Sequence, residues 1–159
     1  MALRSVALTS FVFLLSLISF ASMATSEKCT YIVRVKTGDR FSAGTDSTIS
    51  LKLKSYSGES FTVNNLEEWG LMGPGHEYFE RGNIDVFSGR NACLRVCAIT
   101  VSSNGEGFKP GWYLDYVELT IVGSGKPAKI SFPTNQWLAL DEWPNHLYAD
   151  VDLCYRRKP

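Results

Sequence analysis

A polar loop runs directly into an alternating segment in the stretch Ser42-Ala43-Gly44-Thr45-Asp46-Ser47-Thr48-Ile49-Ser50-Leu51-Lys52-Leu53. This order is the most informative local signal for the fold. In the second half of the stretch every other residue is Ile or Leu, and the residues between them are Ser and Lys. Period 2 predicts a β-strand with one face in a core and the other in water. The preceding loop then lies at the rim of a sheet. There Thr45, Asp46 and Ser47 offer oxygen atoms that either cap their own backbone or hold a cation.

The first 24 residues have the organisation of a secretory signal peptide. Arg4 is their only charged residue, an apolar run covers residues 11–20, and the small residues Ser22 and Ala24 precede a cleavage point after Ala24. A transmembrane anchor is the alternative, but the run is shorter than the roughly 20 residues that a span requires. We therefore expect residues 1–24 to be removed and residues 25–159 to form a single domain.

Composition and charge limit the classes of partner. The chain is 45% hydrophobic and 20% charged, as expected of a folded globular protein. Its formal net charge is +0, and loss of Arg4 leaves one acidic residue in excess, so no nucleic-acid partner is indicated. The absence of a polybasic segment argues against purely electrostatic attachment to a membrane. We expect a monomer in the secretory pathway, either extracellular or in the endoplasmic reticulum. A Lys-Asp-Glu-Leu type ending does not follow Cys154, so this signal does not encode retention in the endoplasmic reticulum.

The four cysteines, all beyond the signal peptide, predict two disulfides in an oxidising compartment. Three pairings can be drawn. We favour Cys29–Cys154, which would join the two ends of the domain, with Cys93–Cys97 closing a short local loop. Zinc is disfavoured because only Cys93 and Cys97 lie close together in the sequence, and neither histidine is near them.

Alternation and turn residues predict about eight short strands and no sustained helix. The expected strands cover residues 29–36, 49–56, 60–64, 84–87, 94–101, 112–122, 128–132, 137–140 and 147–154. Ser88-Gly89-Arg90-Asn91 is interpreted as a turn. The segment from Leu66 to Tyr78 contains three glycines and a proline, which exclude a regular helix. This pattern indicates an all-β protein, an antiparallel β-sandwich.

Four motifs in order then resemble the PLAT domain, the family named for polycystin, lipoxygenase and alpha-toxin. They are Ala43-Gly44-Thr45-Asp46, Phe79-Glu80-Arg81-Gly82, Trp112-Tyr113-Leu114-Asp115-Tyr116-Val117, and Ile130-Ser131-Phe132-Pro133 with Gln136-Trp137-Leu138-Ala139. The resemblance spans about Cys29 to Trp137 and extends towards Cys154. With Gly70-Leu71-Met72-Gly73-Pro74 and the signal peptide, the chain looks most like plant single-domain PLAT proteins associated with stress. The resemblance implies an eight-stranded sandwich of two four-stranded sheets that binds membrane lipid or a protein, in the apoplast or the endoplasmic reticulum.

The calcium sites of the family carry over only in part. In lipoxygenase-type members the loop of the first motif supplies ligands, which corresponds to Gly44, Thr45 and Asp46. Those members also use acidic or amide residues just before the second and third motifs. Here these positions hold Glu77-Tyr78 and Pro110-Gly111. Since calcium takes six to eight oxygen ligands, the resemblance implies at most a weak calcium site, unless Glu77 or Asp85 replaces the missing carboxylates.

Two surfaces are candidates for binding. The membrane-inserting aromatics of the family correspond to Phe41, Phe108 and Trp137, which would bury apolar area in a bilayer interface; a Trp137 packed under the sandwich edge is the alternative. An exposed Trp137 favours lipid, and a buried one favours a protein partner. The second surface is the loop with Trp69, Leu71 and Met72, which suits a protein partner.

No catalytic constellation is recognisable in the sequence. The only histidines, His76 and His146, lie in loops, and neither a Gly-x-Ser-x-Gly nor a His-Glu-x-x-His motif occurs. The paired carboxylates Glu67-Glu68 and Asp141-Glu142 are neighbours whose side chains point apart, as on a solvated surface. We therefore expect a non-catalytic binding module, and the two hypotheses for its ligand are a lipid surface and a protein.

Overall fold

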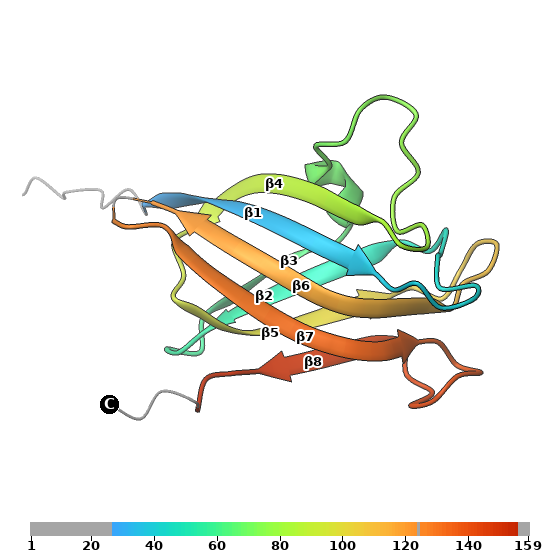
Figure 1. The fold of residues 1–159 in the computed structure, drawn as a ribbon. Coiled ribbons are helices and arrows are strands. Elements are labelled where there is room, and N and C mark those ends of the chain that lie inside the picture. Colours follow the sequence, from blue (N-terminus) through green and yellow to red (C-terminus); the bar gives the residue numbers. More distant parts are fainter. Residues whose placement is uncertain (1–26, 124, 156–159) are drawn as a thin grey trace, which may run out of the picture.

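The computed structural model describes the chain between residues 27 and 155, with the exception of residue 124. Two four-stranded antiparallel sheets, with strand orders β4-β1-β6-β7 and β3-β2-β5-β8, pack face to face (Figure 1). The strands are β1 (Lys28–Thr37), β2 (Ile49–Ser55), β3 (Ser60–Val63), β4 (Ile84–Ala92), β5 (Val96–Ser103), β6 (Trp112–Val122), β7 (Ala128–Leu138) and β8 (Tyr148–Asp152). The expected eight-stranded β-sandwich of two four-stranded sheets is confirmed.

Strand β2 has the two faces that its alternation predicted. Ile49, Leu51 and Leu53 are buried, whereas Lys52 and Lys54 are exposed. The opposite sheet supplies the other half of the core in the same way, with alternate residues of each strand pointing inward. The largest fully buried side chains of the core are Trp112, Tyr31, Phe79, Phe87, Phe132, Ile49, Leu51, Leu53, Leu66, Leu114, Leu119 and Leu138.

Two predicted breaks are continuous strands in the structure. The expected turn at residues 88–91 lies within β4, where Gly89 pairs with Tyr31 of β1. The expected strands 128–132 and 137–140 are one strand, β7, because Pro133 sits on an edge strand, where a missing backbone N–H group is tolerated. The pairing of β7 with β6 shifts register between Leu114 and Tyr116. This shift accommodates the irregular residues that follow Pro133.

The segment that begins at Leu66 opens with a single 3-10 turn, η1 (Leu66–Trp69), and no regular helix follows. Asn65 caps this turn, since its side chain accepts a hydrogen bond from the Glu67 N–H group. Trp69 then lies flat over β4. A Cβ atom at Gly89 would collide with the Trp69 ring, so the glycine provides the space that the indole occupies.

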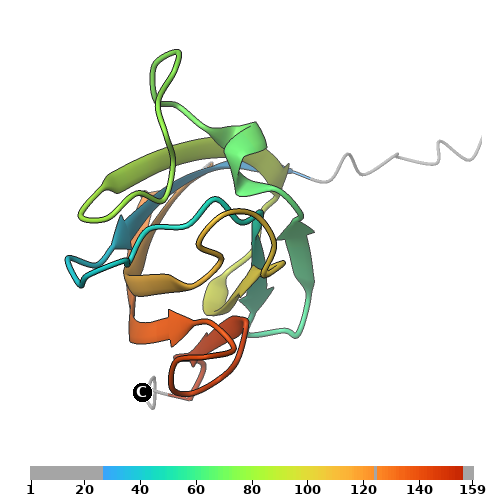
Figure 2. The same cartoon turned by 90° about the vertical axis from the view of Figure 1, so that its right-hand side faces the viewer.

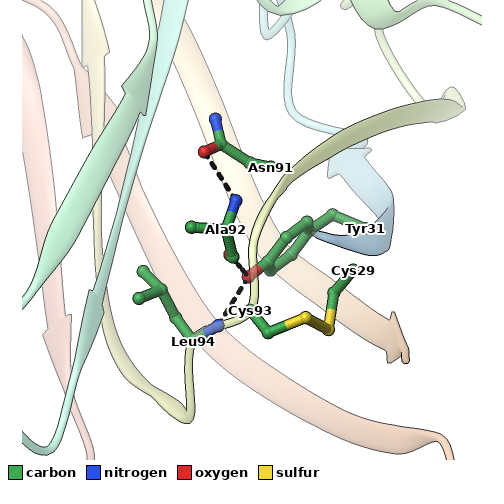
Figure 3. The surroundings of a disulfide bond; sticks show 6 residues. All are labelled: Cys29, Tyr31, Asn91, Ala92, Cys93 and Leu94. Atoms are coloured by element: carbon green, nitrogen blue, oxygen red, sulfur yellow. Dashed lines mark hydrogen bonds between the residues drawn. A yellow bond between two sulfur atoms is a disulfide. The ribbon is translucent and has the colours of Figure 1, made fainter. Parts of the chain in front are cut away.

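The predicted disulfide pairing is wrong. The structure joins Cys29 to Cys93 (Figure 3) and Cys97 to Cys154. Strand register explains the result. In the first sheet Cys29 pairs with Asn91, two residues before Cys93, and in the second sheet Ala98 pairs with Asp152, two residues before Cys154. Cys93 and Cys97 belong to different sheets, so each disulfide closes one sheet at the same end of the sandwich.

The sandwich has two unlike ends. Connections 38–48, 64–83, 104–111 and 139–147 all lie at one end, which faces the viewer in Figure 2. Both disulfides lie at the other end. The expected signal peptide, residues 1–24, falls outside the described residues. Within the described part of the chain, no helix is long and apolar enough to cross a membrane.

Candidate binding surface

Short polar side chains fasten the first loop, residues 38–48, to the loop before β6. The Thr45 hydroxyl donates to the Pro110 carbonyl at 3.2 Å and accepts from the Ser47 N–H group at 3.1 Å. The Ser47 hydroxyl in turn donates to the Glu106 carbonyl at 2.6 Å. Thr45 and Ser47 are buried, so their hydroxyls position the two loops. Of the two alternatives for this motif, the backbone-capping role is the one that the contacts show.

The second motif joins the same framework through a buried carboxylate. Asp85 is fully buried at the start of β4, and its two oxygens contact the Phe79 N–H group at 2.7 Å and His76 Nε2 at 2.6 Å. Phe79 has a positive φ of 58° and accepts a hydrogen bond at its carbonyl from the Thr45 N–H group. Asp85 therefore fixes the backbone that supports the first loop.

The third motif completes the framework from β6. The Trp112 indole donates to the buried Thr37 hydroxyl at 2.9 Å, and the Tyr113 N–H group donates to the Ala43 carbonyl at 3.0 Å. The guanidinium carbon Cζ of Arg40 lies over the Tyr113 ring, 4.1 Å from the ring centroid. Trp137, of the fourth motif, packs edge-on against Tyr113 with 5.3 Å between ring centroids. The first three motifs and the second half of the fourth, Gln136-Trp137-Leu138-Ala139, thus meet at the loop end although they are distant in sequence.

The structure brings the calcium candidates together at the loop end. Gly44, Thr45, Asp46 and Glu77 line one shallow cleft of about 470 Å³ at the loop end, together with Glu80. However, the Thr45 hydroxyl is engaged in the loop contact, and both oxygens of Asp85 are engaged as well. Within the described residues, no group of three or more His, Cys, Asp or Glu side chains is placed to hold a metal ion. Calcium takes six to eight oxygen ligands, and the carboxylates that line this cleft are those of Asp46, Glu77 and Glu80.

Phe41 and Phe108 are the two predicted aromatics that the structure places at loop tips. Their side chains are 86% and 73% exposed, and both line the cleft described above. Trp137 differs from them, because it lies within β7 and is half-buried beside Tyr113. The structure therefore brings Phe41 and Phe108 together at this cleft. Trp137 is packed within β7, and because burial of this residue favours a protein partner over lipid, Trp137 itself gives no support to membrane insertion.

Sequence reasoning missed two apolar side chains at the same end. Leu140 and Trp143 are 68% and 80% exposed in the connection between β7 and β8. A signal was present, since an apolar pair flanking Asp141-Glu142 next to Pro144 indicates a loop that displays its side chains. We call Phe41, Phe108, Leu140 and Trp143 together the rim. Figure 1 shows their three loops reaching outward to a similar level at the right of the sandwich.

The second candidate surface projects sideways from the sandwich. Trp69 is half-buried against β4, whereas Leu71 is 60% exposed and Met72 is half-buried. The Tyr78 hydroxyl accepts from the Met72 N–H group at 3.1 Å, which holds the base of the loop. Figure 2 shows this loop standing apart from the three loops of the rim. The two predicted surfaces are therefore separate.

These features define a two-sheet β-sandwich whose sequence motifs converge on one loop end. The PLAT/LH2 domain profile matches residues 31–148, and the chain belongs to this family. Two relatives from Arabidopsis thaliana agree with the assignment. PLAT domain-containing protein 2 is 42% identical over 95% of this chain and 85% of its own length, and PLAT domain-containing protein 1 is 42% identical over 97% and 87%.

A solved structure supports the fold. The crystal structure of coral 8R-lipoxygenase superposes with a TM-score of 0.57 at 24% sequence identity. The match covers 77% of this chain and 16% of the lipoxygenase chain, so the likeness concerns one domain of a larger enzyme. In that enzyme, calcium activation takes place via a C2-like domain. At this level of identity the comparison establishes the fold.

Proposed function

We propose that this PLAT domain is a non-catalytic module that docks on a lipid surface through the rim. The observation that carries the proposal is the exposure of four large apolar side chains, Phe41, Phe108, Leu140 and Trp143, on three loops at one end. A soluble monomer rarely displays several such side chains on one surface without a ligand to cover them. Trp and Phe at loop tips are also the residues that anchor in a bilayer interface.

The framework beneath the rim favours docking as a rigid body. The contacts of Thr45, Ser47 and Asp85 fix the two loops that carry Phe41 and Phe108 before any ligand arrives, so these loops lose little conformational entropy on binding. Burial of a large apolar side chain contributes about 1.5–3 kcal/mol. Four side chains at the rim are therefore sufficient for reversible attachment, without a covalent lipid or a basic patch.

The charges around the rim indicate the kind of surface. Acidic side chains outnumber basic ones among the exposed charges of its loops: the acidic residues are Asp39, Asp46, Glu106, Asp141 and Glu142, and the basic ones are Arg40 and Lys109. An acidic rim gains nothing from anionic headgroups, so we expect attachment to zwitterionic bilayers and little change with salt. Calcium, if it binds in the acidic cleft, would do so weakly and would modulate attachment to anionic lipid without being required.

The alternative function is binding of a protein through the projecting loop with Leu71 and Met72. Its exposed leucine and adaptable methionine are suited to such a contact. In either case we propose that the chain acts in the secretory pathway or outside the cell, since its two disulfides suit an oxidising compartment. A role in plant stress is proposed from the resemblance alone.

Co-sedimentation of residues 25–159 with zwitterionic and anionic liposomes tests the proposal. Trp143→Ala is expected to weaken binding about tenfold, the loss that corresponds to roughly 1.4 kcal/mol. Tyr155→Ala is the matched control, because Tyr155 is an exposed aromatic that directly follows Cys154 of the disulfide at the opposite end. Binding should persist in chelator. No sedimentation with any lipid would overturn the lipid proposal and favour the protein-binding alternative, for which Leu71→Ala is the variant to examine.

A further inference from the structure

A second hollow lies at the disulfide end, far from the rim. Strands β7 and β8 approach each other at the loop end, where Gln136 Nε2 donates to the Tyr148 carbonyl at 3.1 Å. Figure 1 shows the two strands separating towards the other end. There a hollow of about 930 Å³ opens between the sheets along the edge formed by β7. We call this space the edge hollow. Its volume lies within the range of about 300–1,000 Å³ that is typical of small-molecule sites.

The inner wall of the edge hollow is apolar and fixed. Leu94, Ile130 and Leu153 line it and are only partly buried, so they present apolar surface to the space between the sheets. The disulfides Cys29–Cys93 and Cys97–Cys154 lie in the same wall. Figure 3 shows that Tyr31 adds a further constraint, since its hydroxyl contacts Ala92 and Leu94 on either side of Cys93. These crosslinks keep the wall from collapsing to fill the space.

The mouth of the edge hollow is basic. Four charged residues line the hollow, Glu27, Arg95, Lys126 and Lys129, and three of them are cationic. Lys129 is engaged with Glu118, at 3.2 Å between Nζ and Oε1. Arg95 and Lys126 are exposed, and neither takes part in an ion pair among the described residues. Two cations are thus available beside an apolar wall.

We propose that the edge hollow binds one molecule of a long-chain fatty acid. Its acyl chain would lie against Leu94, Ile130 and Leu153, and its carboxylate would meet Arg95 and Lys126. An apolar cavity with a few charged groups at one side is the usual form of a site for such an amphiphile. A carboxylate that accepts hydrogen bonds from two cations at the mouth also keeps its own charge in contact with water.

An extended peptide strand fits this edge less well. Pro133 lies in β7 within the hollow and has no backbone N–H group to donate to an added strand. The charge at the mouth is local and cationic, which matches a single carboxylate. The site is independent of the rim, because the two lie at opposite ends of the sandwich.

Equilibrium dialysis of residues 25–159 against radiolabelled myristate, kept monomeric, tests the inference. We expect saturation at one molecule per chain. The double variant Arg95→Gln with Lys126→Gln should bind myristate about tenfold more weakly, as expected for loss of hydrogen bonds to charged groups. The unaltered chain should bind methyl myristate more weakly than it binds myristate. The affinity for methyl myristate should be no lower in the double variant than in the unaltered chain.

Three further variants keep the result interpretable. Lys52→Gln with Lys54→Gln makes the same charge change on the outer face of β2 and should leave myristate affinity unchanged. Ala128→Trp, which fills the hollow beside Ile121, should abolish binding while urea unfolding shows a folded domain. Trp143→Ala should bind myristate normally, which separates this site from the rim. The inference is overturned by no saturable binding of myristate, or by equal affinity in the Arg95/Lys126 variant and the lysine control.

Discussion

At the scale of a single residue, Asp85 shows how the loop end depends on a buried side chain that holds the backbone in place. The carboxylate is fully buried and accepts from the Phe79 N–H group, which otherwise has no partner within its loop. We expect Asp85→Ala to lower the free energy of unfolding by about 2–3 kcal/mol, since a buried donor is left unpaired. Urea unfolding provides the measurement. Asp141→Ala, at an exposed position, should change stability by less than about 0.5 kcal/mol.

Tyr31 is expected to make the free energy of unfolding decline at alkaline pH. Burial raises the pKa of its phenol above the usual 10.0, although the hydrogen bond from the Leu94 backbone acts in the opposite direction. The folded state therefore retains this proton more strongly than the unfolded state. Its contribution to stability is complete below pH 10 and declines as the pH rises through the pKa of the folded state.

Unfolding in urea between pH 8 and pH 11 examines this effect. We expect the unaltered chain to lose stability above pH 10 more steeply than Tyr31→Phe. That variant should also be less stable at pH 8 by about 1 kcal/mol, because the phenol contacts of Ala92 and Leu94 are gone. The same slope above pH 10 in both proteins would refute the assignment to Tyr31.

Trp137 and Trp143 show what the sequence leaves undetermined at this scale. Trp137 lies near the end of β7, and Trp143 lies in the connection that follows that strand. Only the pairing of β7 with β6 places Trp137 against Tyr113, and only the length of the following loop places Trp143 in solvent. Exposure depends on these long-range partners, so local pattern identified the loop end but selected the wrong tryptophan for its tip.

At the scale of elements, alternation predicted the strands well where neither glycine nor proline interrupted them. Strands β2 and β6 match their expected ranges closely. The errors in β4 and β7 arose because Gly89 and Pro133 are usual turn residues. In the fold each has a tertiary reason to lie in a strand, since Trp69 covers Gly89 and Pro133 occupies a sheet edge.

The fit of Trp69 over β4 is testable at Gly89. We expect Gly89→Ala to destabilise the domain by about 1–3 kcal/mol, because the added methyl group collides with the Trp69 indole ring. Gly73→Ala is the control, since a Cβ atom at Gly73 has open space around it. Thermal unfolding of both variants supplies the comparison. Equal stability of the two variants would show that Trp69 does not pack as described.

At the scale of the whole molecule, the family motifs predicted the sandwich and its loop end because three of them and the second half of the fourth belong to the framework there. The disulfide pairing was not predictable in the same way. It depends on which strands are neighbours in each sheet, and the sequence separations of 64 and 57 residues carry no information on that choice. The edge hollow likewise results from the divergence of two sheets and has no local sequence signal.

The disulfide Cys97–Cys154 is expected to stabilise the closed end of the second sheet. Cys97→Ala with Cys154→Ala should lower the free energy of unfolding by about 2–4 kcal/mol, mainly through the larger entropy of the unfolded chain. Peptide mapping of the unreduced protein should recover Cys29 linked to Cys93. Recovery of a Cys93–Cys97 peptide would contradict the pairing on which the two fixed ends of the sheets depend.

The most direct test of membrane docking is quenching of tryptophan fluorescence by lipids with brominated acyl chains. Docking through the rim predicts that tryptophan fluorescence of the unaltered domain is quenched on zwitterionic vesicles. The quenching should be almost completely lost in Trp143→Phe and should persist in Trp137→Phe. That result would place Trp143 in the bilayer and Trp137 outside it. Quenching that survives in Trp143→Phe, or no quenching in the unaltered domain, would contradict docking through the rim.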